Sequence, residues 1–367
     1  VYKRQVKDCG MPLADYGWDP MWQFYVDEIA DADLVPGRLA TVDRGQAVVI
    51  TDQGPRPASW RYPVAILEEP EGVAPAVGDW ALLSGPPESS AIQVLLPRRT
   101  LLARGTAKGS RVTQPLAANV DLVVAMTALD GDFSLRRIER FLALARSGSA
   151  RALVVLSKAD LRDESDEELR RAHEVAPGVD VLTVSAVTGQ GVEALENQLG
   201  PGRTAVLVGS SGVGKSTLIN RLLGEERQRT GSVRASDDRG RHVTTRRELL
   251  PLSTGGLIID TPGLREVGLL ADEQALREVF PEIAALAERC RFGDCRHLEE
   301  PGCAVRQAVE TGELLVDRVD SYQRLVRELD SAERRESEHL RRAHERATVG
   351  HYRRWLREVH RFKGRNN

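Results

Sequence analysis

Short apolar runs separated by Gly, Pro and Asp residues occupy positions 34–100 of the chain. Five of these runs have the composition of short β-strands: Arg38–Thr41, Gln46–Thr51, Pro63–Leu67, Trp80–Leu83 and Ala91–Leu95. Five short strands in so few residues predict a small β-barrel, of either the OB-fold or the SH3-like type. We expect residues 1–33, which precede this barrel, to be a disordered extension.

The pattern changes within residues 112–270, where apolar runs alternate with helical stretches such as Ser134–Arg146. The runs expected to be buried strands are Asp121–Thr127, Ala152–Leu156, Val181–Val184, Ala205–Val208 and Leu257–Ile259. This alternation predicts a multidomain α/β protein with a doubly wound parallel sheet at its centre. Residues 271–330 are expected to form a small helical domain, and residues 331–367 a charged helix with few apolar positions.

A glycine-rich segment, Gly209–Ser216, lies between one of these strands and a helical segment. Strand, glycine-rich turn and helix together predict a loop that binds the phosphates of a nucleoside triphosphate. Backbone N–H groups and the positive end of the helix would face the phosphates, while Lys215 would reach the terminal phosphates and Ser216 would bind Mg²⁺. The residues expected to contact the nucleotide here are Gly209, Ser210, Ser211, Gly212, Val213, Gly214, Lys215, Ser216 and Thr217.

Two further stretches at the ends of predicted strands favour guanine as the base. Ser157, Lys158 and Asp160 follow one strand, and Ser185 and Ala186 follow the next. One carboxylate at Asp160 can accept both the N1 and the N2 hydrogens of guanine, a donor pair that adenine lacks. The stem of Lys158 would lie along the base, and Ser185-Ala186 would give a backbone N–H to guanine O6. Because ligand loops gather at the strand ends of such sheets, these stretches should converge with the phosphate loop.

The remaining nucleotide-binding candidates lie near the strand that Asp260 ends. Asp260 would hold Mg²⁺ through water, and the Gly263 N–H would sense the γ-phosphate. Upstream, Thr244 and Thr245 end a polar loop, and Thr245 is the first choice for a threonine that ligates Mg²⁺ only when the γ-phosphate is present. Thr244 is the second choice, and the alternative is that this loop is only a mobile surface segment.

The order of these motifs along the chain is permuted. An ordinary GTPase presents the phosphate loop first and the base-reading motifs last, whereas here Asp160 and Ala186 precede Lys215. All the loops still converge on one edge of the sheet, so the permutation leaves the site intact. It also makes the segment after Gly263 run directly into the next domain.

Three of the four cysteines gather beside a histidine. Cys290, Cys295, His297 and Cys303 supply three thiolates and one imidazole, which is a complete tetrahedral set for one structural Zn²⁺. In a cytosolic nucleotide-binding protein such a cluster indicates a metal site rather than disulfides.

The formal net charge of the 367 residues is −3, but it is unevenly spread. Residues 331–367 carry eleven Arg or Lys against five Glu, a net charge of +6, so the rest of the chain is acidic. A basic tail predicts a polyanionic partner, and a simply solvated charged helix is the alternative. No apolar run approaches the roughly 20 residues that span a membrane, so we expect a cytoplasmic protein without membrane contacts.

Together, these motifs and their permuted order resemble the ribosome small subunit-dependent GTPase A family, whose members are circularly permuted GTPases. The resemblance covers about residues 34–330, and it includes Ala117–Asp121 and the sequence GRHVTT at residues 240–245. It implies an N-terminal OB-fold, a permuted GTPase domain and a C-terminal zinc domain. It also implies hydrolysis of GTP to GDP and phosphate, coupled to binding and release on the small ribosomal subunit during late maturation, with rRNA contacts. We expect a monomer.

Three positions depart from the usual pattern. Ser157 replaces the Asn of the guanine motif, which removes one carboxamide contact to the base. Val243 replaces the first switch threonine, and Leu264 stands where many GTPases place a water-orienting Gln. The resemblance implies that the switch histidine, His242, takes over that role. The expected catalytic residues are therefore His242, Lys215 and Thr245.

Two other classes of function stay open. One is an RNA- or protein-binding scaffold that binds GTP but hardly hydrolyses it, which Ser157 and Leu264 would fit. The other is a GTPase that delivers a metal or a client protein, with the cysteines as a transfer site. The closed set of four ligands argues against this second alternative.

Overall fold

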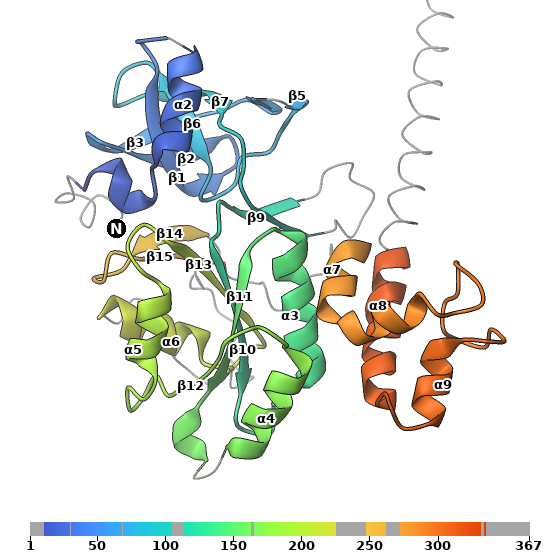
Figure 1. The fold of residues 1–367 in the computed structure, drawn as a ribbon. Coiled ribbons are helices and arrows are strands. Elements are labelled where there is room, and N and C mark those ends of the chain that lie inside the picture. Colours follow the sequence, from blue (N-terminus) through green and yellow to red (C-terminus); the bar gives the residue numbers. More distant parts are fainter. Residues whose placement is uncertain are drawn as a thin grey trace, which may run out of the picture.

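The computed structural model describes residues 11–29, 31–67, 69–104, 114–162, 165–224, 247–261, 272–331 and 334. These residues form a β-barrel, a central sheet flanked by helices, and a helical C-terminal unit, in that order along the chain (Figure 1). Within these ranges no helix combines the length and the apolar content that crossing a membrane requires.

A closed ring of five strands forms the barrel. The strands are β1 (Val35–Asp43), β2 (Gln46–Thr51), β3 (Gly54–Ser59), β6 (Trp80–Ser84) and β7 (Ser90–Leu95). They pair in the order β1-β2-β3-β7-β6 and back to β1, and every pair is antiparallel except β3 with β7. The predicted small barrel is confirmed, with the five-stranded form of an OB-fold.

The strand content of the barrel differs from the prediction at two places. The run Pro63–Leu67 contains β4 (Val64–Ile66), which pairs with β5 (Glu69–Val73) and with β7 and so lies outside the ring. The ring uses β3 instead, whose sequence contains Pro55 and Pro57 in place of an apolar run. Because proline has no N–H to donate, such a sequence gives no strand signal, and only pairing with β2 and β7 defines this strand.

The predicted disorder of residues 1–33 is wrong for the part that the structure describes. Leu13–Tyr16 forms a short 3₁₀ turn, η1, and Pro20–Ile29 forms helix α2. Trp22 of α2 is 1% exposed and lies against Trp80 of the barrel, with ring centroids 6.2 Å apart. The indole of Trp18 meets the same Trp80 ring edge-on at 4.8 Å. The partner that orders this segment is therefore Trp80 of the barrel, which lies more than fifty residues further along the chain.

The central sheet contains five parallel strands in the order β12-β11-β10-β13-β15. They are β10 (Leu122–Ala128), β11 (Arg151–Ser157), β12 (Val181–Val184), β13 (Thr204–Gly209) and β15 (Leu257–Asp260). From β10 the chain adds β11 and β12 on one side, and it then returns to add β13 and β15 on the other side. The direction of winding therefore switches between β10 and β13, and the crevice outside the carboxyl ends at such a switch is where ligands bind.

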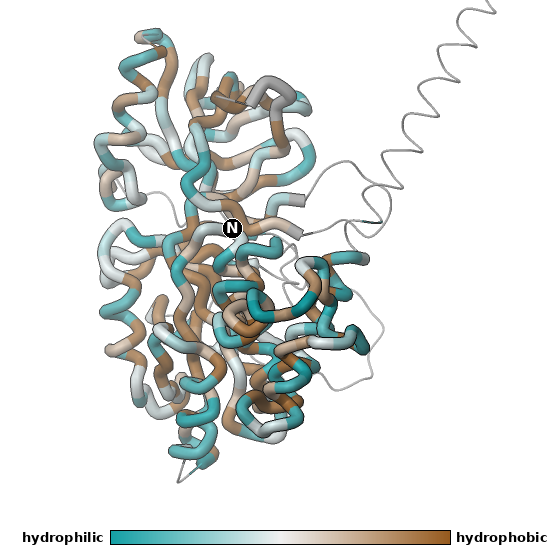
Figure 2. The backbone as a smooth tube through the Cα atoms, turned by 45° about the vertical axis from the view of Figure 1, so that its right-hand side comes forward, coloured by the Kyte–Doolittle hydropathy of each residue, from teal (hydrophilic) through white to brown (hydrophobic). Residues whose placement is uncertain are grey.

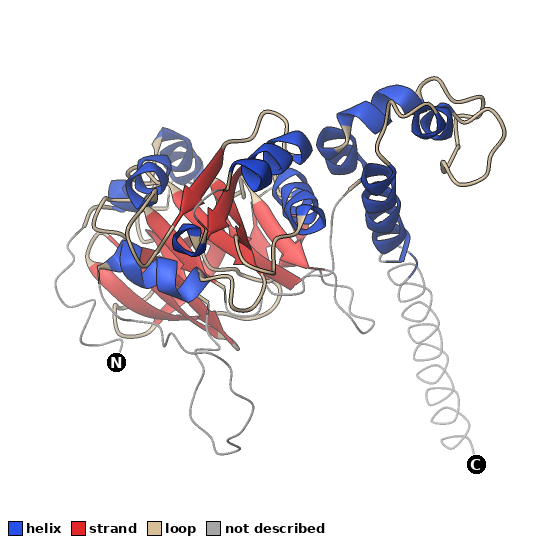
Figure 3. Ribbon diagram, turned by 90° about the horizontal axis from the view of Figure 1, so that it is seen from below, coloured by secondary structure: helices blue, strands red, loops and turns tan. Residues whose placement is uncertain are grey.

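Helices cover both faces of this sheet (Figures 1 and 3). Helices α3 (Leu135–Ser147) and α4 (Asp166–Val175) contribute to a core on one face, and α5 (Val192–Gln198) and α6 (Lys215–Leu223) to a core on the other. Hydrophobic residues follow the strands between these two layers (Figure 2). The predicted doubly wound parallel sheet is thus confirmed.

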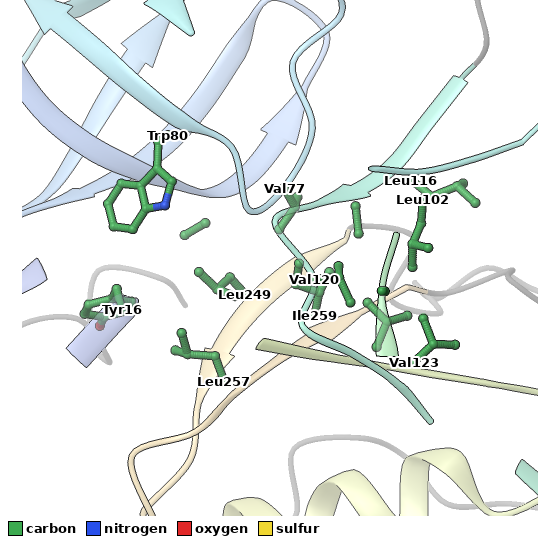
Figure 4. Packing of buried hydrophobic residues seen from close by; sticks show 14 of the residues in the cluster. Tyr16, Val77, Trp80, Leu102, Leu116, Val120, Val123, Leu249, Leu257 and Ile259 are labelled. Atoms are coloured by element: carbon green, nitrogen blue, oxygen red, sulfur yellow. The ribbon is translucent and has the colours of Figure 1, made fainter. Parts of the chain in front are cut away.

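The barrel and the central sheet share one hydrophobic core. Strand β14 (Glu248–Pro251) pairs with β15 and with barrel strand β1, so one sheet runs through both parts. A ribbon of β8 (Leu101–Arg104) and β9 (Gln114–Ala118) lies at the same junction. Trp80 of the barrel, Ile259 of the sheet and side chains of the ribbon belong to a single buried cluster (Figure 4). The orientation of the barrel on the sheet is therefore fixed by packing.

Arg38 of β1 is buried within this junction and is only 2% exposed. Its guanidinium donates hydrogen bonds to the carbonyl oxygens of Tyr16, Gly78 (3.2 Å) and Asn119 (2.9 Å). These acceptors belong to the N-terminal segment, the barrel and the segment that enters β10. Burial lowers the pKa of Arg38 to about 10, which still leaves the side chain charged at neutral pH.

The C-terminal unit contains α7 (Glu273–Val279), α8 (Pro281–Ala287), α9 (Ala304–Glu310) and a further helix over residues 316–331. It packs against α3. The buried Arg318, in the helix over residues 316–331, donates a hydrogen bond to Glu139 of α3. The same arginine donates to Glu282 of α8 at 2.6 Å. The unit is thereby attached to the helix that leads away from β10.

Replacing Arg38 by Met should destabilise the junction. Methionine fills much of the volume but removes the Arg38 donor from the buried carbonyl groups of Tyr16 and Asn119, whereas the Gly78 carbonyl keeps a hydrogen bond from Asn119 Nδ2. This loss should lower the free energy of unfolding by about 3 kcal/mol. Urea unfolding followed by tryptophan fluorescence would measure this loss. Arg44→Met, at an exposed turn position, is the control and should change stability by less than about 0.5 kcal/mol. Equal stability of the two variants would contradict the role given to Arg38.

Candidate functional site

A pocket of about 300 Å³ opens beside the carboxyl ends of the central strands. It is lined by Lys158 and Asp160 after β11, by Ala186 after β12, and by Gly214 and Thr217 from the phosphate loop and α6. The rest of the lining is mostly apolar: Met126, Ser157, Leu161, Val184, Val187, Val213 and Leu218. Residues from three predicted motifs thus surround one cavity with apolar walls and few polar groups, as small-molecule sites do.

The phosphate loop, Gly209–Ser216, leads from the end of β13 into α6, whose first residue is Lys215. Gly212 and Gly214 have φ angles of +78° and +97°, which residues with a side chain rarely adopt. The Lys215 ammonium donates to the carbonyl oxygens of the first two loop residues, at 2.6 Å each. Thr217 follows in the same helical turn. These two hydrogen bonds hold the Lys215 ammonium close to the start of the loop.

Ser157, the position where we expected a lost contact to the base, is 5% exposed and connects two motifs. Its hydroxyl donates to the carbonyl oxygen of Val213 in the phosphate loop at 2.6 Å and also lies 3.3 Å from the Thr127 carbonyl. A single hydroxyl is sufficient for this link. The structure therefore gives Ser157 a role that the sequence did not indicate, which is to tie the guanine motif to the phosphate loop.

The motif after β12, which contains Ser185 and Ala186, orients Asp160. The hydroxyl of Ser185, a fully buried residue, donates to Asp160 Oδ1 and accepts the N–H of Thr188 at 3.1 Å. The Ser185 N–H donates to the Gln190 carbonyl at 2.9 Å. Since that N–H is engaged, Ala186 is the better candidate of the two for a contact to guanine O6.

Lys158 and the phosphate loop also meet two acidic residues that sequence reasoning missed. Lys158 Nζ lies 2.7 Å from Asp130 Oδ2, and the Ser210 hydroxyl donates to Asp132. Both aspartates follow β10 in the loop before α3. The signal that could have found them is the one that singled out Asp160, a polar residue just after a buried strand.

Asp260 ends β15, where its backbone pairs with that of Glu248 on β14. Burial raises the pKa of Asp260 to about 6, the charge of Glu248 adds to this, and the charge of Lys215 opposes it. The Asp260 carboxyl group thus lies within the electrostatic reach of the phosphate-loop lysine. The other candidates near this strand, His242, Thr244, Thr245 and Gly263, lie outside the described residues.

Four side chains of the C-terminal unit converge as a candidate metal centre. The ligand atoms of Cys290, Cys295, His297 and Cys303 all lie within 4.8 Å of one another. His297 Nδ1 is 3.4 Å from Cys303 Sγ and 3.6 Å from Cys290 Sγ, and these two sulfurs are 3.9 Å apart. Burial lowers the pKa of His297, which favours the neutral imidazole that coordinates a metal. The four residues can therefore hold a metal ion.

Neighbouring groups hold these ligands in place. The His297 backbone has φ +60°, and its carbonyl accepts a hydrogen bond from Gln323 Nε2 at 2.9 Å. Cys303 precedes α9, and its sulfur accepts the Arg306 N–H at 3.5 Å. Such contacts orient ligands around a metal.

Comparison with known proteins agrees with this arrangement. The model of the RsgA GTPase family matches residues 95–270, and that of the 50S ribosome-binding GTPase family matches residues 204–337. The small ribosomal subunit biogenesis GTPase RsgA of Opitutus terrae is 45% identical, over 91% of this chain and 94% of its own length. The protein of the same name from Streptomyces coelicolor is also 45% identical, over 86% of each chain.

Solved structures show the same fold. The crystal structure of YjeQ from Thermotoga maritima aligns with a TM-score of 0.60 at 28% identity, covering 81% of this chain and 98% of its own. YloQ, described as a circularly permuted GTPase, aligns with a TM-score of 0.58 at 24% identity, over 82% of this chain and 96% of its own. With nearly its whole length matched by relatives at this level of identity, the chain belongs to the RsgA GTPase family.

Proposed function

We propose that this protein hydrolyses GTP to GDP and phosphate and couples the reaction to binding and release on the small ribosomal subunit during its late maturation. The observation that carries the proposal is the single pocket where Lys158, Asp160 and the phosphate loop meet in spite of their permuted order. The name of the relatives, small ribosomal subunit biogenesis GTPase, supports the choice of partner. The protein would act in the cytoplasm as a monomer.

The base-reading residues would share the recognition of guanine. Asp160, oriented by the Ser185 hydroxyl, would accept the N1 and N2 hydrogens. The Lys158 stem would cover the face of the base, and the Ala186 N–H would donate to O6. A purine without the N2 amino group would leave one of the Asp160 lone pairs unmatched, so the pocket should discriminate against it.

The phosphate-binding residues would act on the other half of the nucleotide. Lys215 would bind the terminal phosphates, and Ser216, Asp260 and Thr245 (or Thr244 in its place) would hold the Mg²⁺. Bound Mg²⁺ supplies neutralising charge at the β- and γ-phosphates. The Gly263 N–H would sense the γ-phosphate, and His242 would orient the attacking water.

The remaining parts would serve structure and partner binding. We assign Zn²⁺ to the Cys290–Cys303 cluster because three thiolates and one imidazole form a closed tetrahedral set, which suits a structural ion. The barrel and the basic residues 331–367 would contact rRNA, where positive charge favours the phosphate backbone.

Purified small ribosomal subunits should increase GTP turnover by about tenfold or more, because a docked partner can complete the set of groups that positions the attacking water. Phosphate release measured with and without small subunits checks this, with large subunits and the Lys215→Ala variant as controls. Turnover that the small subunit leaves unchanged would instead favour a scaffold that binds GTP with little hydrolysis.

Asp160→Asn should exchange the base preference from guanine to xanthine. The amide presents a donor where guanine needs an acceptor, whereas xanthine carries a carbonyl oxygen at C2. We expect GDP affinity to fall by about a hundredfold and XDP affinity to rise above it, with the phosphate loop unaffected. Titration with fluorescent GDP and XDP measures both constants. Unchanged GDP affinity would remove Asp160 from the site.

Cys295→Ser should release the metal and loosen the C-terminal unit while nucleotide binding in the sheet persists. Losing one of four ligands typically removes most of the metal affinity of a structural site. Because the bound metal also stabilises the small unit that holds it, this unit should loosen. Metal content by mass spectrometry and GDP titration would be measured together. Cys9→Ser, which alters the one cysteine outside the cluster, is the matched control. One bound zinc per chain in Cys295→Ser would refute the assignment.

A further inference from the structure

The loop between β10 and α3 touches the nucleotide site at two separate points. Asp130 Oδ2 accepts a hydrogen bond from Lys158 Nζ at 2.7 Å, and Asp132 accepts one from the Ser210 hydroxyl. The sheet explains why both contacts occur in one short loop. Strand β10 has β11, which Lys158 follows, on one side, and β13, which leads into the phosphate loop, on the other. The loop after β10 therefore lies between the base-reading motif and the phosphate loop.

Each aspartate in this loop is neutralised by a cation. The hydrogen bond from Lys158 lowers the pKa of Asp130. Burial acts to raise the pKa of Asp132, but hydrogen bonds from Ser210 and Arg137 outweigh it and lower that pKa. Arg137 contacts both carboxylate oxygens of Asp132, at 2.8 and 3.0 Å. An unpaired carboxylate beside a phosphate loop would repel a triphosphate, so this pairing is what makes two acidic residues compatible with the site.

Arg137 also takes part in the contact between Asp132 and Ser210. Its Nη1 lies 3.3 Å from the Ser210 hydroxyl while it also binds Asp132. Three side chains from the β10 loop, α3 and the phosphate loop therefore fix one another. The Ser210 backbone, whose carbonyl oxygen accepts a hydrogen bond from Lys215, is held at this point of the sheet.

We propose that Asp130 and Asp132 are positioning residues for nucleotide binding. Asp130 anchors the ammonium of Lys158, so that the stem of this lysine stays along the wall of the base pocket. Asp132, together with Arg137, anchors Ser210 and so fixes the first turn of the phosphate loop. Neither aspartate lines the base pocket itself. The inference rests on the GTP site proposed above.

Two double-mutant cycles test the proposal, one pairing Asp130→Ala with Lys158→Ala and one pairing Asp132→Ala with Ser210→Ala. Each aspartate variant alone should raise the Kd for GDP by about fivefold, because the side chains are partly exposed and such contacts are modest. In the background of its partner variant, each aspartate substitution should have almost no further effect. Asp130→Asn and Asp132→Asn keep an acceptor oxygen and should recover most of the affinity.

The kinetic readout separates positioning from general stability. Asp130→Ala should raise the KM for GTP about as much as the Kd, with kcat changed less than about twofold. A merely structural role would reduce the folded fraction and the melting temperature while leaving the KM of the remaining enzyme unchanged. Asp317→Ala, whose side chain is 93% exposed, is the control and should match the parent in Kd, KM and melting temperature.

Additive losses in both cycles, or an unchanged Kd in Asp130→Ala and Asp132→Ala, would overturn the proposal. Loss of affinity with an unchanged KM and a lowered melting temperature would overturn it as well. These outcomes are distinct from failure of the nucleotide site, which would show as absence of GDP binding in the parent protein.

Discussion

The reversal of winding between β10 and β13 is the constraint on which the nucleotide site depends. Parallel strands place all their carboxyl ends at one edge of a sheet, and only at such a reversal do the two adjacent loops leave toward opposite faces and open a crevice. In this protein the β10 loop and the phosphate loop border that crevice, and the guanine motif follows the next strand. The site is therefore defined by neighbouring strands and is insensitive to the order of motifs along the chain.

Two connections join the nucleotide edge of the sheet to the C-terminal unit. One is covalent, since the chain passes from Asp260 at the end of β15 to α7 within twelve residues. The other is the packing of α3, which begins just after the Asp132 loop. Its residues Glu139 and Arg140 contact the helix over residues 316–331 through Arg318 and Glu328.

The barrel is attached in a different way. It adds strands to the same hydrogen-bonded sheet through β1 and β14, and it shares a buried cluster with the sheet. At this junction the buried Arg38 donates one hydrogen bond each to the N-terminal segment, to the barrel itself and to the segment that enters β10. Leaving any of these carbonyl groups unpaired in an apolar interior is costly, so the junction holds the barrel in one orientation relative to the nucleotide edge.

The sequence alone determined the features that depend on local pattern. The alternation of strands and helices, the turn of the phosphate loop and the Cys290–Cys303 cluster can be recognised because their signal lies within a few consecutive residues. Only the tertiary structure decided the features that depend on partners distant in the chain. Strand β3, with its two prolines, exists because β2 and β7 supply its hydrogen bonds, and α2 is ordered because Trp80 covers Trp22. Likewise Ser157 and Asp132 acquire their roles from contacts with the phosphate loop, which lies more than fifty residues away. Contacts between residues so far apart cannot be predicted from the local sequence pattern around either one.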